Sequence, residues 1–101
     1  MKNLKKLFKK SLRIREIILD KSHPDVGSSY NNLASLYCSM KEFKKSHEYM
    51  SVALKILETT LPEDHPNLVG SRNIMQYIEN MLVEEAMERV TSLDYLYGKN
   101  E

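Results

Sequence analysis

The chain of 101 residues is poor in residues that interrupt helices or cross-link chains, with three glycines, three prolines and one cysteine. This scarcity of glycine and proline favours long helices over a fold of strands and tight turns. A single cysteine, Cys38, excludes an internal disulfide and is typical of a reducing compartment, so we expect a cytoplasmic protein. No apolar run approaches the roughly 20 residues that a membrane-spanning helix needs.

Motifs for catalysis and for cofactor binding are also missing. The sequence has no glycine-rich phosphate loop and no strained serine elbow. His23 and His65 lie 42 residues apart without acidic or thiol residues at ligand spacing, and each precedes a proline, which favours a role in a turn over metal binding. Cys38 has no evident histidine partner, which favours a packed or groove-lining thiol over a nucleophile. We therefore expect no enzymatic activity, catalytic residue, cofactor or metal site.

The net charge of +1 hides an opposition between the two halves of the chain. Residues 1–50 carry 11 Lys and Arg against 5 Asp and Glu, a net charge of +6, whereas residues 51–101 carry 4 against 9, a net charge of −5. The simplest interpretation is that solvated faces happen to differ. The alternatives are a basic end that docks on an acidic surface, or head-to-tail contact between copies of the chain.

The spacing of apolar residues predicts five helices, over residues 3–20, 24–39, 42–60, 66–80 and 83–97. Pro24 and Pro66 then fall in first turns, where proline is well tolerated. Because no glycine or proline lies between Ser71 and Tyr97, one long helix is the alternative to the last two. The side chains expected to be buried include Leu4, Leu7, Phe8, Ser11, Ile14 and Ile18 in the first helix, and Val83, Ala86, Val90, Leu93 and Leu96 in the last.

A period of 42 residues runs through most of the chain. The segment LRIRE at residues 12–16 recurs as LKILE at residues 54–58, and His23-Pro24 recurs as His65-Pro66. A fixed period of about 20–50 residues is typical of stacked units that bury their apolar faces only against neighbouring units. The pattern fades after Asn73, as expected of a terminal unit that caps the stack.

Together, SLRIRE at residues 11–16, His23-Pro24 and YNNLASLY at residues 30–37 resemble the 42-residue tetratricopeptide repeats of kinesin light chains and nephrocystin-type proteins. The resemblance covers about residues 4–75. It implies a single domain with an all-α fold, a solenoid of helical hairpins with about five antiparallel helices. In that family each hairpin has an A-type helix followed by a B-type helix.

Two features of the chain depart from the family pattern. Residues 3–20 match a B-type helix without its A-type partner, so the chain is expected to be a fragment, a short divergent relative, or a piece completed by another chain. Lys41 replaces the glycine that the family has between the two helices of a hairpin, so we expect a wider or slightly strained turn there.

The resemblance implies that partner contacts come from A-type helices, which line the concave face of such stacks. Asn31 and Asn73 share one place in the repeat, and an amide can pair with the backbone of an extended peptide whatever its sequence. The alternative is that these amides bond to a neighbouring helix or face water. The residues predicted to contact a peptide or partner helix are Ser28, Asn31, Ser35, Arg72, Asn73 and Tyr77.

The predicted function is non-enzymatic protein–protein interaction, as an adaptor or scaffold whose concave groove takes a peptide or partner helix. The alternative is structural, with copies stacking on one another, or on another repeat protein, through the open end helices. A third hypothesis places the basic segment 2–15 on an anionic membrane or on nucleic acid. Its apolar side chains are more simply explained as core, and the nearly neutral chain argues against nucleic acid.

Overall fold

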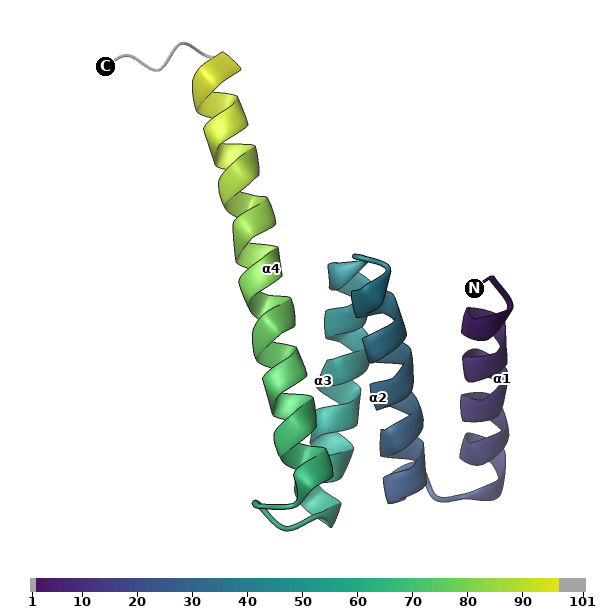
Figure 1. Cartoon of the computed structure of the whole chain (residues 1–101). Helices are drawn as coiled ribbons and strands as arrows, with labels where there is room; N and C mark the ends of the chain where they lie inside the picture. The colour runs from purple at the N-terminus through teal and green to yellow at the C-terminus, as the bar shows by residue number, and fades with distance from the viewer. Residues whose placement is uncertain (1, 97–101) are drawn as a thin grey trace.

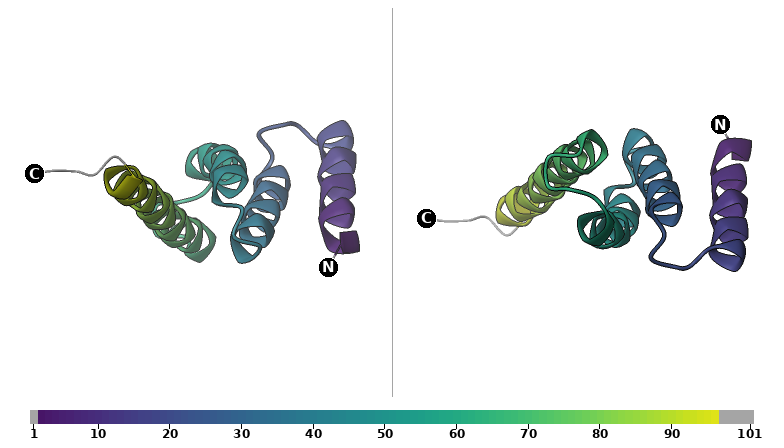
Figure 2. Two further views of the ribbon diagram at one scale, coloured as in Figure 1. Left: turned by 90° about the horizontal axis from the view of Figure 1, so that it is seen from above. Right: turned by 90° about the horizontal axis from the view of Figure 1, so that it is seen from below.

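The computed structural model describes the backbone of residues 2–96 and the side chains of residues 3–91. These residues form four helices and no strand: α1 (Lys2–Ile18), α2 (Pro24–Ser39), α3 (Phe43–Thr60) and α4 (Pro66–Leu96). Successive helices are antiparallel and lie side by side (Figure 1). Viewed along the helices, α3 is displaced to one side of α2 and α4 (Figure 2). The structure confirms the all-α stack of helical hairpins.

The helices α2 and α4 begin in the same way, one repeat apart. The Nδ1 atom of His23 accepts a hydrogen bond of 3.0 Å from the backbone N–H of Asp25. The Nδ1 atom of His65 accepts a bond of 3.1 Å from the backbone N–H of Asn67. Each histidine thus satisfies one of the N–H groups that the first turn of a helix leaves without a partner. Helix capping is therefore a role that the two recurring histidines share.

The turn between α2 and α3 is tight, and its left-handed residue is Lys41, with φ of 62°. The N–H of Glu42 donates to the carbonyl of Tyr37 at 2.9 Å, and the N–H of Lys41 donates to the carbonyl of Cys38 at 3.0 Å. This is the Schellman pattern that glycine usually completes. The turn therefore stays narrow and carries the strain of a Cβ atom in the left-handed region, about 1 kcal/mol.

The core consists of two clusters that share α2. The buried residues between α1 and α2 are Leu12, Val26, Leu33 and Tyr37. Those between α2, α3 and α4 are Ala34, Phe43, Met50, Ala53 and Ile78. A buried hydroxyl, that of Ser46, donates a hydrogen bond of 2.6 Å to the carbonyl of Ala34, so α3 is tied to α2 without an unsatisfied polar atom at this point.

The face of α1 that packs on α2 differs from the stripe predicted for the first helix. Leu12 is the side chain of α1 that is buried, whereas Leu7, Ile14 and Ile18 are each more than half exposed. Arg15 also faces α2, because its guanidinium donates to the hydroxyl of Ser29 at 2.8 Å. The predicted stripe was wrong for these three residues: α1 has one described neighbour, and that neighbour covers a different side of the helix.

The fourth and fifth expected helices are one continuous helix, α4, of 31 residues. The expected break near residues 80–83 is absent, since no residue there interrupts the backbone ladder. Val83 and Val90 are more than half exposed instead of buried. The side chains of Leu93 and Leu96, the residue Tyr97 and the expected stop at Gly98 lie outside the described part. None of the four described helices is both long and apolar enough to cross a membrane.

Candidate functional site

The helices α2 and α4 flank a groove that contains two adjoining hollows. The proximal cavity, about 290 Å³, lies beside the first turns of both helices. The distal cavity, about 470 Å³, lies beside the last turns of α2. Ile74 lines both cavities, so they adjoin at this residue, and we call them together the α2–α4 groove.

Five of the six residues predicted to contact a partner line this groove. Ser28 and Asn31 lie in the proximal cavity. Ser35, Asn73 and Tyr77 lie in the distal cavity. The structure therefore brings side chains from two repeats, 42 residues apart in the sequence, to the same side of the molecule.

Asn31 also has a structural role. Its Oδ1 atom accepts a hydrogen bond of 2.7 Å from the hydroxyl of Ser71, which is buried on α4. This contact between adjacent repeats is one of the alternatives considered for the asparagines. The bond uses the side-chain oxygen, and the amide NH₂ group offers two donors in addition. Asn31 therefore links α2 to α4 at the base of the groove and also lines its surface.

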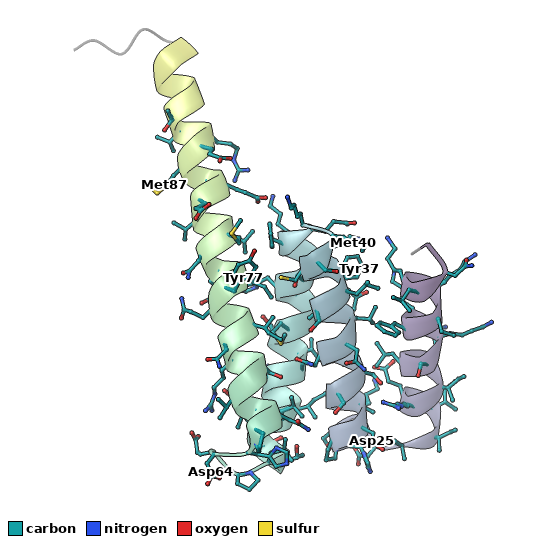
Figure 3. All side chains as sticks on the ribbon, in the orientation of Figure 1. Asp25, Tyr37, Met40, Asp64, Tyr77 and Met87 are labelled. Carbon is teal, nitrogen blue, oxygen red and sulfur yellow. The ribbon has the colours of Figure 1, made fainter. Side chains whose placement is uncertain are left out.

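Asn73 and Tyr77 are the exposed residues that α4 contributes to the distal cavity. The side chain of Tyr77 is 52% exposed, and its ring meets that of Phe43 edge-to-face with centroids 6.3 Å apart. Figure 3 shows Tyr77 on α4 at the height of the upper turns of α2 and α3. An anchored aromatic ring that remains half exposed offers apolar contact area to a ligand at little cost in side-chain entropy.

Arg72, the sixth predicted residue, lines neither cavity. Its guanidinium donates to the carboxylate of Glu58 at 3.2 Å and to that of Glu63 at 3.1 Å. The same contact holds the pKa of Glu63 below its usual value. Because a helix turns by about 100° per residue, Arg72 and Asn73 point in different directions. The structure places Arg72 at the contact between α4 and the end of α3.

The groove surface is partly apolar and nearly uncharged. Most of its polar groups are hydroxyls and amides, and Lys41 is the one charged residue among those that line the two described cavities. Burial raises the pKa of the Cys38 thiol, which lines the distal cavity, so this thiol is protonated at neutral pH. Such a surface suits a peptide backbone better than a strongly charged ligand.

Sequence reasoning missed several lining residues, notably Asn32, Asn67 and Ile74. Asn32 and Ile74 are adjacent in sequence to Asn31 and Asn73, and Asn67 lies one turn before Gly70. A search for positions within one turn of the predicted asparagines would have found Asn32 and Ile74 but not Asn67. Outside the groove, no group of three or more potential metal-ligating side chains gathers among the residues that the structure describes.

A family model described as a tetratricopeptide repeat matches residues 3–59, which include α1, α2 and nearly all of α3. No curated protein matches the chain.

Proposed function

The chain belongs to the tetratricopeptide repeat family, and from this premise we propose that it is a non-enzymatic interaction module that binds a peptide or partner helix in the α2–α4 groove. Stacked helical repeats generally bind other proteins along an extended surface. The proposal assigns the contacts to Ser28, Asn31, Ser35, Asn73 and Tyr77. Arg72 is left out of this set because it is paired with acidic residues beside the groove.

The observation that carries the proposal is that two adjoining cavities place residues from both repeats along one face of the molecule. An extended peptide needs partners for backbone groups at regular intervals, and amide side chains can donate and accept. Asn31 and Asn73 supply such groups from α2 and α4, and the ring of Tyr77 supplies apolar area at the distal end. Because two repeat units offer little surface that a ligand can bury, we expect dissociation constants for peptides on the order of micromolar.

We infer in addition that the repeats are of the long type found in kinesin light chains and nephrocystin-type proteins. The period of 42 residues and the His-Pro pairs at the starts of α2 and α4 support this subtype. A cytoplasmic adaptor or scaffold is the corresponding role, and the single cysteine agrees with that compartment.

The test is to pan a random peptide library against the purified chain and to compare two variants. The groove variant, Asn73→Leu/Tyr77→Ala, changes two exposed residues of the distal cavity. The control, Asn80→Leu, makes the same asparagine-to-leucine substitution on the same helix. Asn80 accepts a hydrogen bond of 3.1 Å from Gln76 and lines neither cavity.

We expect enriched peptides to bind the native chain and the control equally, and to bind the groove variant at least tenfold more weakly. Helicity measured by circular dichroism must be the same for all three proteins. Peptides that bind the groove variant as well as the native chain would place the binding surface elsewhere. A library that enriches no peptide would count against peptide recognition altogether.

A further inference from the structure

The hydroxyl group of Tyr37, on α2, is buried without a hydrogen-bond partner. The side chain of Tyr37 is fully buried, and its Oη atom is the one buried side-chain oxygen or nitrogen among the described residues that forms no hydrogen bond. Figure 3 shows Tyr37 near the upper end of α2. A polar atom that loses its water on folding and gains no partner lowers stability, so this hydroxyl group calls for a ligand, an ion or a water molecule.

Three lysine side chains lie close to the ring of Tyr37. The Nζ atoms of Lys5 and Lys9, on α1, lie 5.2 and 5.9 Å from the ring centroid. The Nζ atom of Lys45, on α3, lies 5.8 Å from it. The ring of Tyr49 stacks on that of Tyr37 with centroids 5.3 Å apart. The buried ring thus has positive charge beside it from two helices.

The hydroxyl group lies beside Lys9 and still has a proton to donate. Its contact with Lys9 raises the pKa of the lysine, so the side chain is an ammonium group at neutral pH. No hydrogen bond joins the two groups. An ammonium group has donors and no acceptor, so Lys9 cannot accept the proton of the hydroxyl group. The missing partner of Tyr37 is therefore an acceptor, which none of the three lysines can supply.

The lysines themselves are not neutralised by acidic residues. Within the part of the chain that the structure describes, none of the three forms an ion pair. The exposed carboxylate of Glu42 acts on Lys9 only from a distance. Lys5 and Lys9 lie one turn apart on the same face of α1, where like charges repel each other. An anion between them would offset this repulsion.

The start of α3 adds to the positive potential. Lys45 is the third residue of α3, whose first turn contains no acidic residue, and Glu42 before it makes no side-chain cap. The helix α2, in contrast, begins with the cap of His23 and with Asp25 in its first turn. Because the N-terminal end of a helix carries partial positive charge, the beginning of α3 also favours an anion.

We propose that Lys5, Lys9 and the hydroxyl group of Tyr37 bind a phosphate group, with Lys45 contributing positive charge from α3. The hydroxyl group donates to one phosphate oxygen, and the ammonium groups of Lys5 and Lys9 donate to the others. A phosphate group has at least three acceptor oxygens for donors from different helices, whereas a carboxylate has two. The side chains of Lys9 and Lys45 are exposed, so the ligand enters from solvent when they move aside.

This site is separate from the α2–α4 groove, because none of its residues lines either cavity of the groove. The phosphate group is either the free ion or an ester carried by another molecule. Both sources present the same oxygens to Tyr37 and the lysines, and the experiment distinguishes them.

Thermal unfolding of the full chain in phosphate and in chloride, at the same pH and ionic strength, tests the proposal. Tyr37→Phe removes the hydroxyl group and keeps the ring. Lys5→Met/Lys9→Met removes two charges and keeps unbranched side chains. The control, Lys6→Met/Lys10→Met, makes the same substitutions one residue further along α1, where both side chains are exposed and lie outside the cluster around Tyr37. Circular dichroism establishes that all four proteins have the same helicity.

We expect the unfolding midpoint of the native chain and of the control to rise with phosphate concentration and to saturate, with a dissociation constant on the order of millimolar. Tyr37→Phe and Lys5→Met/Lys9→Met should bind phosphate at least tenfold more weakly. In chloride, Tyr37→Phe should unfold at the same temperature as the native chain or higher, because the hydroxyl group has no partner there. The two buffers should therefore rank the native chain and Tyr37→Phe differently.

Three results would overturn the proposal: a native chain whose midpoint is the same in both buffers, a phosphate effect that is as large in Tyr37→Phe as in the native chain, or an equal loss of the effect in the control. The last result would assign phosphate binding to the overall charge of α1. Tyr37→Phe decides alone if the lysine variant loses helicity.

Titration with N-acetyl-phosphoserine amide, beside inorganic phosphate, identifies the source of the phosphate group. Binding of both compounds, weakened in Tyr37→Phe, means that the site takes free and esterified phosphate, whereas binding of inorganic phosphate alone restricts the ligand to the free ion. The groove variant Asn73→Leu/Tyr77→Ala should bind phosphate as the native chain does. Loss of peptide binding in that variant with intact phosphate binding keeps the outcomes of the two proposals apart.

Discussion

The hydroxyl of Tyr30 on α2 donates a hydrogen bond of 2.8 Å to the carboxylate of Glu16 on α1. One period later, the guanidinium of Arg72 on α4 donates a bond of 3.2 Å to the carboxylate of Glu58 on α3. The two contacts occupy the same place between successive units. The repeat thus sets where side chains meet, while the chemistry of each contact depends on the residues present.

The contact at Tyr30 predicts how stability changes in alkali. Burial, reinforced by donation to Glu16, raises the pKa of Tyr30 from 10.0 to about 12. Because the pKa is raised in the folded state, the contact stabilises fully below pH 10, the unfolded value, and this stabilisation is lost as the pH rises through the folded value. Urea unfolding of the native chain and of Tyr30→Phe should therefore differ by a constant amount up to pH 10, and by less at higher pH.

Glu16→Gln separates the two causes of this shift. It keeps an acceptor oxygen but removes the negative charge, so the pKa of Tyr30 should fall part of the way towards its ordinary value. Burial should still hold it above that value. Ultraviolet titration of tyrosinate, with Tyr30→Phe subtracted, measures the change. An unaltered titration in Glu16→Gln would show that the carboxylate has no part in the shift.

The turn at Lys41 predicts a stabilising substitution. Glycine adopts the left-handed conformation without a Cβ penalty, so Lys41→Gly should raise the free energy of unfolding by about 0.5–1 kcal/mol. Lys41→Ala removes the charge but keeps the Cβ atom, and it should change stability little. Urea midpoints measure both effects. Equal stabilisation by glycine and alanine would assign the effect to the charge and not to the backbone.

The histidine caps predict a loss of stability on substitution. His65→Ala removes the acceptor for the N–H of Asn67 and should lower the free energy of unfolding by about 1 kcal/mol. His65→Asn keeps a capping oxygen and should recover most of the loss. Because His23 caps a different helix, the effects of His23→Ala and His65→Ala should add. An alanine variant as stable as the native chain would show that the cap makes no net contribution to the free energy of unfolding.

Two glycines within helices provide a matched pair. A Cβ atom at Gly27 would lie 3.0 Å from Ile56 and 3.1 Å from Leu57, whereas one at Gly70 would meet nothing within 4 Å. Gly70→Ala should stabilise the chain by up to about 1 kcal/mol through helix propensity. Gly27→Ala should destabilise it by about 1 kcal/mol, because the overpacking between α2 and α3 exceeds that gain. Thermal unfolding that ranks Gly27→Ala above Gly70→Ala would contradict the close packing at Gly27.

Gly70→Ala also bears on the groove. Gly70 lines the proximal cavity, so the added methyl group should weaken peptide binding while it strengthens the fold. Stability and binding are then expected to change in opposite directions for one substitution. A variant that gained stability and bound peptide as well as the native chain would show that the proximal cavity lies outside the binding surface.

Local signals predicted the hairpins well. The His-Pro pairs mark the starts of α2 and α4, and the 42-residue period aligns α1 with α3, because both features depend on neighbouring residues and on the repeat. The exposure of Ile14 and Ile18 was beyond such reasoning. A row of apolar residues identifies a face that can be covered, and which face is covered depends on the neighbours that pack against it.

The candidate site was predictable in part for the same reason. Ser28 and Asn73 follow from the repeat alone, whereas the bond from Ser71 to Asn31 depends on the distance between α2 and α4. The case of Arg72 differs, because its position one residue before Asn73 already placed it on another side of the helix. The continuity of α4 agrees with the absence of glycine and proline between Ser71 and Tyr97. The alternative prediction of one long helix was based on this absence.

The unbroken course of α4 has a mechanical consequence. Its 31 residues correspond to a rod of about 46 Å at 1.5 Å per residue. One end forms a wall of the groove, and the other projects beyond α2 and α3 (Figure 1). With no hinge along its length, a load applied near Met87 acts as on a lever and is transmitted to Asn73 and Tyr77.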